Sequence, residues 1–419
     1  MKSYYVRHRP GNHGGKILAV VMILCIAAAY LTMMRNEHPE VIDKALFNVC
    51  SFLGIDYSPM PEADNANSTI AVTSWLPDEY AVGYDFSLCY FYNQFDDFDK
   101  AVYEIFYDMI MHKDVEGYSR SLAFPASEYS ERAEKMYLIY DAMLYDNPEF
   151  FYLEVTEEPR VNIKGMTVGN NASVSFTLNP GIENENFMIG EFEYAADLFM
   201  EDINLLTTDA EIELQIHDKL IDLVSYDYAA LDRDPSGDLA HTAYGALVDD
   251  GHGSSNSAVC SGYARAFQYL LKKAGIMSVQ VSGVGGTITD GTNDEGSHGW
   301  NLVLLDGEWY ETDCTWDDPN FERIGLDEDT IEYIEGLDDA YFASTHYWYN
   351  RTTEEMKHLP EMPDYVLEYP IENGVATIQM CDESYHIRGI DPSEEGYELV
   401  TFINDMLPVA EGTKYGLGL

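Results

Sequence analysis

Three side chains that together can perform nucleophilic catalysis stand in one stretch of the 419-residue chain. Cys260 follows the small, polar run GHGSSNSAV, His298 lies in SHGWNLVLLDG, and Asp313 lies in EWYETDCTWDDP. A thiolate attacks carbonyl carbon, an imidazole accepts and returns the proton, and a carboxylate holds the imidazole. These residue types favour a Cys-His-Asp triad that forms a covalent acyl intermediate, provided that the fold brings them together.

Cys260 is expected at or just before the first turn of a helix. Apolar residues recur after it at helical spacing: Tyr263, Phe267, Leu270, Leu271 and Ala274. Gly275 is a typical helix stop signal. The free N–H groups and the positive dipole end of a helix start favour a thiolate and can also hold an oxyanion. The alternative is a structural role, in which Cys260 is a small side chain buried where two helices pack. Its place at the helix start alone does not decide between a nucleophile and a structural cysteine.

A hairpin is expected after this helix. Asp306 and Gly307 separate two strand-like runs and have the residue types of a type I′ turn. A two-residue turn pairs Leu305 with Glu308. The register of the two strands follows from this pair.

Counting outward from the turn places Trp300 opposite Asp313 and His298 opposite Thr315. His298 and Asp313 then share one face of the sheet as diagonal neighbours, close enough for a carboxylate to hold an imidazole. Cys314 points to the other face and is expected in the core. The three residues of the triad therefore lie on a helix and on two adjoining strands.

An apolar segment near the N-terminus, residues 17–34, has the length and composition of a membrane-spanning helix. Four basic residues and no acidic ones precede it: Lys2, Arg7, Arg9 and Lys16. The positive-inside rule then keeps the N-terminus in the cytoplasm and places the rest of the chain outside. We expect a single-pass anchor with an extracytoplasmic catalytic domain.

A cleaved signal peptide is the alternative, because Ala27 and Ala29 could form a cleavage site and release a secreted protein. An uncleaved anchor is favoured because the apolar run continues to Met34. Cys25 follows Leu24 rather than a small residue, which argues against a lipoprotein cysteine.

The charge of the chain is strongly negative. It has 23 basic and 74 acidic residues, and residues 1–35 hold five of the basic ones and none of the acidic ones, so residues 36–419 carry 18 − 74 = −56. Such a surface repels nucleic acid and anionic lipid headgroups. We expect no nucleic-acid partner, and contact with the bilayer only through residues 17–34. Solubility or salt tolerance explains the charge better than cation binding.

No metal or other cofactor is expected. Besides Cys25, the cysteines are an odd and scattered set: Cys50, Cys89, Cys260, Cys314 and Cys381. They show neither a disulfide framework nor zinc spacing. A zinc site of His241, His252, Cys260 and His298 would lack any Cys-x-x-Cys or His-x-x-x-His element. The acidic run DGTNDEGSH lacks the spacing of a calcium loop.

Five regions are expected along the chain. A basic tail and anchor (1–35) leads to a tether rich in acidic and turn-forming residues (36–69). An N-terminal α+β region (70–205) precedes the catalytic core (206–358), and residues 359–419 form a C-terminal extension without an assigned role. The core is expected to begin at a helix, because Thr208 and Glu211 have capping-box spacing.

Residues 70–205 contain nothing arranged like a reaction centre. Periodicity and composition predict a strand at 80–92, helices within 96–111 and 126–153, and a strand at 169–180. The tyrosines are spread along the whole chain, so composition does not separate an aromatic-rich core from a carbohydrate-facing surface.

The chain resembles the transglutaminase-like superfamily, and its exported bacterial members in particular. The resemblance covers residues 209–358 through HTAYGALVDDGHGSSNSAVCSGYARAFQYLLKKAGI, HGWNLVLLDGEWYETDCTWDDP and THYWYNRTTEEMKHL. It implies an α+β fold with a papain-like core, in which a helix bearing the cysteine packs on an antiparallel sheet bearing the histidine and aspartate. By this resemblance Cys260 is the nucleophile, His298 the general base and acid, and Asp313 the residue that orients His298.

The implied reaction is acyl transfer from peptide or protein amides at the cell surface. Water as acceptor makes a peptidase or amidase, an amine makes a transglutaminase, and the triad does not distinguish them. Calcium-dependent mammalian members have additional β domains and calcium sites, whose patterns are absent from this sequence. The alternative is a non-catalytic binding module on the same fold. His241 and Trp300 could contribute to substrate or oxyanion binding, although structural roles are expected for both.

Overall fold

The structure is a computed structural model in which twelve segments are described: 71–74, 83–115, 118–155, 160–233, 237–249, 256–289, 292–318, 345–357, 366–371, 374–379, 383–394 and 396–416. The expected anchor at 17–34 and the tether at 36–69 lie outside these residues. Within the described segments, no helix is both long enough and apolar enough to cross a bilayer.

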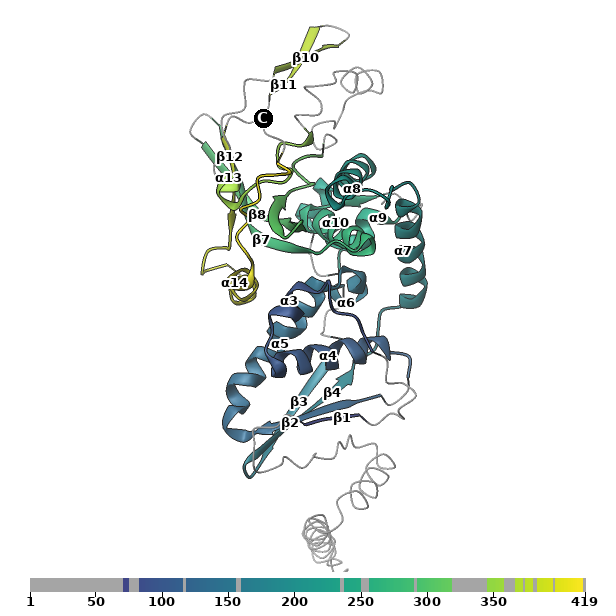
Figure 1. Cartoon of the computed structure of the whole chain (residues 1–419), viewed down its shortest axis with the longest axis vertical. Coiled ribbons are helices and arrows are strands. Elements are labelled where there is room, and N and C mark those ends of the chain that lie inside the picture. Colours follow the sequence, from purple (N-terminus) through teal and green to yellow (C-terminus); the bar gives the residue numbers. More distant parts are fainter. Residues whose placement is uncertain are drawn as a thin grey trace, which may run out of the picture.

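The N-terminal part of the described chain combines an antiparallel sheet with helices (Figure 1). Its strands lie in the order β1-β2-β4-β3: β1 (Ala71–Ser74), β2 (Arg120–Pro125), β4 (Asn171–Leu178) and β3 (Val161–Val168). Its helical elements are α3 (Tyr90–Gln94), α4 (Asp97–Met111), η2 (Ala126–Glu128), α5 (Tyr129–Asp146), η3 (Pro148–Phe150), α6 (Phe151–Glu154) and α7 (Glu185–Met200). The helices predicted within 96–111 and 126–153 and the strand predicted at 169–180 are confirmed.

The strand predicted at 80–92 is wrong, because Tyr90–Gln94 form the short helix α3. The backbone N–H groups of Phe91 and Tyr92 each donate to the buried carboxylate of Asp146, at 3.0 Å. This carboxylate comes from α5 and satisfies first-turn donors that have no partner within a helix. A long-range contact therefore stabilises the helix against the strand preference of Tyr90, Phe91 and Tyr92.

The second part of the chain carries the predicted triad. Its helical elements are α8 (Asp209–Leu223), η4 (Tyr228–Asp232), η5 (Leu239–His241), α9 (Ala243–Leu247), α10 (Cys260–Ala274), α13 (Thr353–Lys357) and α14 (Tyr397–Met406). Its strands are β5 (Ser225–Tyr226), β6 (Ser257–Ala258), β7 (Ser278–Thr289), β8 (Thr292–Leu305), β9 (Glu308–Thr312), β10 (Val366–Ile371), β11 (Gly374–Gln379) and β12 (Glu383–Arg388). The fold is α+β, as predicted.

Local signals in the sequence set several of these boundaries. Thr208 caps α8, and its capping box with Glu211 is present. Helix α10 begins at Cys260 and ends before Gly275, whose φ of 86° is left-handed. Strands β8 and β9 pair Leu305 with Glu308, and both turn residues have positive φ, as a type I′ turn requires. The predicted helix start and hairpin register are confirmed.

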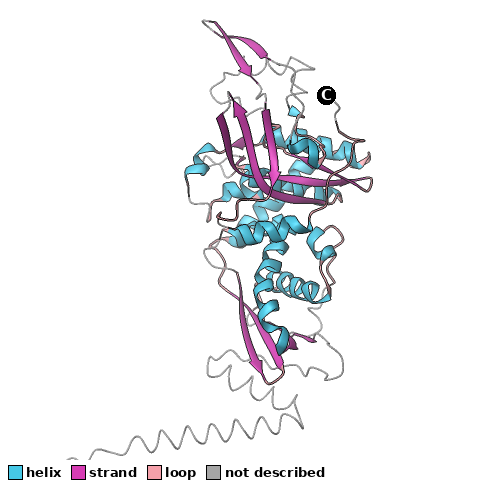
Figure 2. Cartoon of the chain, turned by 90° about the vertical axis from the view of Figure 1, so that its left-hand side faces the viewer, coloured by secondary structure: helices cyan, strands magenta, loops and turns pink. Residues whose placement is uncertain are grey.

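An antiparallel sheet in the order β12-β7-β8-β9 supports the Cys260 helix (Figure 2). Helix α10 packs against β7 and β8. Phe267 and Leu270 of the helix and Val279 and Leu302 of the sheet are completely buried and belong to one hydrophobic core. This burial fixes α10 on the sheet, because each such side chain contributes about 1.5–3 kcal/mol when removed from water.

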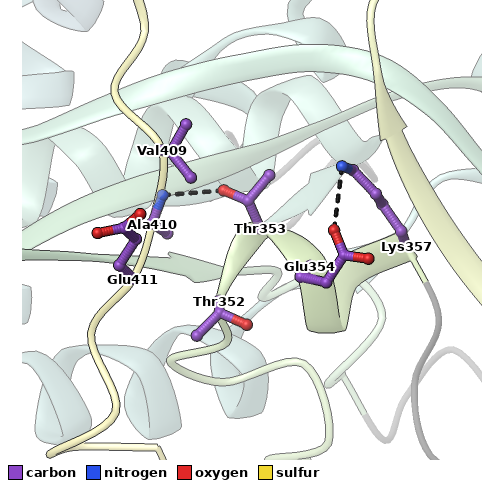
Figure 3. A pocket seen from close by; sticks show the side chains of 7 residues that line it. All are labelled: Thr352, Thr353, Glu354, Lys357, Val409, Ala410 and Glu411. Carbon is purple, nitrogen blue, oxygen red and sulfur yellow. Dashed lines mark hydrogen bonds and ion pairs between the residues drawn. The ribbon is translucent and has the colours of Figure 1, made fainter.

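Both flanking regions contact this core. From the N-terminal part, the backbone carbonyl of Tyr145 accepts a hydrogen bond from Gln268 Nε2 of α10 at 2.7 Å. From the C-terminal residues, β12 pairs with β7, and the backbone N–H of Ala410 donates to Thr353 Oγ1 at 2.9 Å (Figure 3). Gly412 N donates to Trp309 O at 3.1 Å. Strand β12 and residues 410–412 are therefore an integral part of the layer that holds the site.

Candidate active site

Cys260 is the first residue of α10 and is partly exposed. The extended residue Val259 precedes it and donates its N–H to the carbonyl of Ala240 at 3.0 Å. Gly262 lies so close to the same loop that a Cβ there would stand 2.5 Å from Ala240 O. The backbone around the thiol is thus fixed by the 239–242 loop.

His298 lies on β8, and its Nε2 is 2.6 Å from Oδ2 of Asp313. The carboxylate is buried and the imidazole is only slightly exposed. Asp313 directly follows β9, so the predicted contact across the hairpin is confirmed. The imidazole also interacts with the Cys260 thiol, and this interaction raises the pKa of His298 and lowers that of Cys260. Since Nε2 is used by Asp313, Nδ1 is the ring nitrogen that is left for the thiol.

The electrostatics favour a thiolate paired with an imidazolium. Burial raises the pKa of the Cys260 thiol, but hydrogen bonding and charge from His298, together with the N–H of Gly299, bring it below its ordinary value. Burial lowers the pKa of His298, whereas the charge and hydrogen bond of Asp313 raise it to about 10. Burial opposes the charge on Asp313, yet the two histidines that bond to it, His298 and His386, hold the carboxyl pKa well below its usual range.

Both carboxylate oxygens of Asp313 accept hydrogen bonds. Its Oδ1 accepts the backbone N–H groups of Thr315 at 2.9 Å and of Trp316 at 3.4 Å. Its Oδ2 accepts His298 and also Nε2 of His386, at 2.7 Å. His386 comes from β12, in the region that sequence reasoning left without a role.

Backbone hydrogen bonds also fix the main chain of Asp313. Its backbone N–H donates to the carbonyl of Trp348 at 3.2 Å, and its carbonyl accepts the N–H of Asp317 at 3.2 Å. Asp317 accepts the N–H of Trp348 at 2.8 Å and contacts Nε2 of His217 on α8 at 3.2 Å. Burial lowers the pKa of His217, but the carboxylates of Asp218 and Asp317 raise it to about 9, so the imidazole is charged at neutral pH.

The two secondary candidates lie beside this arrangement. The imidazole of His241 is 3.3 Å from Ser261 Oγ through Nδ1, and burial lowers its pKa. Trp300 is buried, stacks on His298 with ring centroids 5.9 Å apart, and donates Nε1–H to Glu311 at 2.5 Å. Trp300 therefore supports the face of His298 rather than presenting a polar group to a substrate. Cys314 is buried, as expected.

Two groups of side chains in the described segments have a ligand set that a metal could use. They are His298, Asp313 and His386, and, separately, His217, Asp218 and His346. Both groups are already joined by hydrogen bonds between their own nitrogen and oxygen atoms. His252, part of the zinc site weighed from the sequence, lies outside the described residues. The first group is a hydrogen-bonded chain that runs from His386 through Asp313 to His298.

A family model of the transglutaminase-like superfamily matches residues 199–314, the span that contains Cys260, His298 and Asp313. This part of the chain belongs to the transglutaminase-like superfamily. The helix that bears the cysteine and the antiparallel strands that lead to the histidine and aspartate are its transglutaminase-like core.

The chain is also similar to individual proteins. Kyphoscoliosis peptidase of Mus musculus is 31% identical over 91 residues, which are 21% of this chain and 13% of that protein. Among solved structures, a TGase is 13% identical with a TM-score of 0.26, over 37% of this chain and 45% of that one. A candidate cysteine protease of Cytophaga hutchinsonii is 14% identical with a TM-score of 0.21, over 37% of this chain and 62% of that one.

Proposed function

We propose that this chain is a cysteine enzyme that transfers acyl groups from peptide or protein amides. The observation that carries the proposal is the arrangement of Cys260, His298 and Asp313, with the thiol at a helix start and the carboxylate 2.6 Å from the imidazole. The interaction of His298 with the thiol, which lowers the pKa of Cys260, supports it. A nucleophile, a base and an orienting group in hydrogen-bond reach are the requirements of covalent acyl transfer.

In the first half of the reaction, the Cys260 thiolate attacks the amide carbonyl and forms a C–S bond. The negative charge moves to the carbonyl oxygen, where N–H groups at the start of α10 can stabilise it. His298, as imidazolium, gives its proton to the departing nitrogen while the C–N bond breaks. The products of this half are an amine and a thioester on Cys260.

In the second half, neutral His298 accepts a proton from water or from an acceptor amine, which attacks the thioester carbonyl. The C–S bond breaks, and the thiolate is restored beside the imidazolium. Asp313 remains ionised throughout and keeps Nε2 of His298 protonated, so that Nδ1 faces the reacting atoms. Water gives a carboxylic acid and an amine gives a new amide.

Acylation by p-nitrophenyl acetate tests the chemistry without knowledge of the natural substrate. The full chain should release one equivalent of p-nitrophenolate in a burst and carry an acetyl group on the peptide that contains Cys260. Cys260→Ala should do neither. Absence of the burst and of the acetyl group in a folded wild-type chain would contradict the proposal and favour a binding module.

The acceptor is found by adding cadaverine, a lysine-like primary amine, to the same reaction. Acetylcadaverine as the main product indicates amine transfer, and acetate as the main product indicates hydrolysis. The ratio of the two products at a fixed amine concentration measures how well the site excludes water.

We also propose that residues 17–34 anchor the chain and that the enzyme works outside the cytoplasm. The proposal is supported by the basic residues before the apolar segment and the net charge of −56 after residue 35. Protease treatment of intact cells should remove the domain and leave an N-terminal reporter protected. If the domain is removed only after lysis, the orientation is wrong; if it is found in the medium without residues 1–29, the segment is a signal peptide.

A further inference from the structure

His386 places a second imidazole against Asp313. It lies on β12, opposite Gly285 of β7, and only 1% of its surface is exposed. Its Nε2 is 2.7 Å from Oδ2 of Asp313, the oxygen that His298 contacts at 2.6 Å. Two histidines from different strands thus meet at one carboxylate oxygen.

The donor and acceptor roles follow from the carboxylate. An ionised carboxylate only accepts hydrogen bonds, so Nε2 of His386 must carry a proton, as must Nε2 of His298. With the backbone N–H groups of Thr315 and Trp316 on Oδ1, Asp313 accepts four hydrogen bonds. A carboxylate has about four acceptor sites, and filling all of them holds the group in one orientation.

The surroundings of His386 keep the ring neutral. Its ring centroid lies 4.0 Å from that of Trp348, 4.6 Å from Trp316 and 5.0 Å from Trp300. In the described part of the chain, no hydrogen-bond partner faces its Nδ1. A proton on Nδ1 would therefore be buried without an acceptor, at a large cost in free energy.

The ionisable groups around His386 are Asp313, His298 and Glu311. Burial lowers the pKa of His386 to about 4, although the Asp313 carboxylate opposes this effect. His386 thus adds a hydrogen bond to Asp313 without adding a positive charge that would compete with the imidazolium of His298.

We propose that His386 is a positioning residue of the active site, which acts on His298 through Asp313. The inference rests on the proposed function, and it adds to the triad a residue that lies beyond the family match at 199–314. By fixing the carboxylate, His386 fixes the ring of His298 with Nδ1 toward Cys260. A loosely held carboxylate would let the imidazole turn away from the thiol.

Two variants separate the hydrogen bond from the packing. His386→Phe keeps a buried ring but removes the donor, and His386→Gln retains an amide N–H that can reach the position of Nε2. His386→Phe should slow acylation of Cys260 by p-nitrophenyl acetate at least about tenfold, with KM within about twofold. His386→Gln should recover most of the rate. If His386→Phe does not fold, His386→Asn, whose amide is too short to reach Asp313, replaces it and should show the same loss.

The pH dependence of Cys260 alkylation by iodoacetamide provides a readout that needs no substrate. If His386 positions His298, loss of its donor weakens the stabilisation of the thiolate, and the midpoint of the alkylation profile moves to higher pH in His386→Phe but not in His386→Gln. A purely structural role of His386 would lower the melting temperature and leave this midpoint in place.

A double-mutant cycle tests whether His386 acts on Cys260 and His298 through Asp313. In an Asp313→Ala background, His386→Phe should cause no further loss, because the residue through which it acts is gone. If the losses of activity caused by Asp313→Ala and His386→Phe multiply in the double variant, the inference is overturned. It is also overturned if His386→Phe has the same acylation rate and the same alkylation profile as the wild type. If wild-type Cys260 is never acylated, the proposed function fails, whereas the alkylation profiles still decide whether His386 influences the thiol.

Discussion

The ammonium group of Lys272 lies 2.8 Å from the carboxylate of Glu149, which ties the far end of the Cys260 helix to the N-terminal part of the chain. The same ammonium donates to Oδ1 of Asn147 at 2.8 Å and to the carbonyl of Asp146 at 3.2 Å. The carboxylate of Asp146 in turn holds the start of α3. The Lys272 ammonium therefore joins α10 to residues 146–149, and Asp146 joins these residues to α3.

Lys272→Met should reduce stability without altering the thiol. It removes hydrogen bonds to a partly buried cation and should lower the free energy of unfolding by about 2 kcal/mol. Lys273→Met is a matched control, because Lys273 pairs with the exposed Asp197 and its loss should cost less than about 0.5 kcal/mol. Urea unfolding measures both, and equal losses would show that the contact with Glu149 is not special.

Cys260 should react with iodoacetamide at a lower pH than an ordinary thiol. Its lowered pKa places the midpoint of the alkylation profile below that of an ordinary thiol. Cys89 and Cys314 serve as internal controls, because both are buried and burial raises their pKa values, that of Cys89 to about 12. They should stay unlabelled while the chain is folded. A midpoint at the ordinary thiol value would remove the case for an activated Cys260.

Amide hydrolysis or transfer should also decline at high pH. His298 must carry a proton to give to the departing nitrogen, and it loses this proton as the pH rises through its pKa of about 10. On the acid side, activity declines as Cys260 becomes protonated. A profile of kcat/KM without an alkaline limb would indicate that another group protonates the leaving amine.

Asp313→Asn should abolish most of the activity while the fold remains. If the Asn oxygen accepts the N–H groups of Thr315 and Trp316, its NH₂ group faces Nε2 of His298 and of His386, which can then no longer donate. His298 is forced into the tautomer with its proton on Nδ1, toward the thiol. We expect kcat to fall at least about a hundredfold.

Asp306→Asn is the control for that change. It removes the same charge from the same hairpin, but at an exposed turn where Asn-Gly is as suitable as Asp-Gly. Its activity should equal that of the wild type. Circular dichroism establishes that both variants are folded, and an active Asp313→Asn enzyme would mean that another residue orients His298.

Gly262→Ala should disturb the site through sterics alone. The added Cβ would stand 2.5 Å from Ala240 O and 2.7 Å from Ala258 Cβ, so the backbone next to Cys260 must shift. We expect a loss of about 1–3 kcal/mol in stability and slower acylation of the thiol. Gly190→Ala, in α7 with nothing within 4 Å, should be neutral or stabilising. Thermal melting and the p-nitrophenolate burst measure the two effects.

Local signals predicted the parts of the site that lie close together in the sequence. The helix start at Cys260 follows from periodicity and a stop glycine, and the contact of His298 with Asp313 follows from one turn, because a hairpin register is fixed by its loop. The triad could be proposed for these reasons. The roles of its members stay predictions until the thiol is tested.

The sequence could not reveal His386, because the burial of β12 opposes the usual pattern. His386 is 1% exposed and its neighbour Ile387 is 48% exposed, whereas alternation would place the isoleucine inside and the histidine outside. The buried histidine is stable there because Asp313 accepts a hydrogen bond from its Nε2. Helix α3 shows the same principle, since its N–H groups are held by Asp146 from another helix.

Because β12 pairs with β7, this sheet can be completed only late in the synthesis of the chain. Residues 383–388 pair with residues 283–288, so β7 is synthesised about 100 residues before its partner strand. A growing chain passes through a stage in which Cys260, His298 and Asp313 have all been made while the outer edge of β7 still lacks β12. An open strand edge is a template for pairing with other chains. The strand that carries His386 thus also covers the edge of β7 and becomes the outer strand of the sheet, and this protection of β7 arrives late in synthesis.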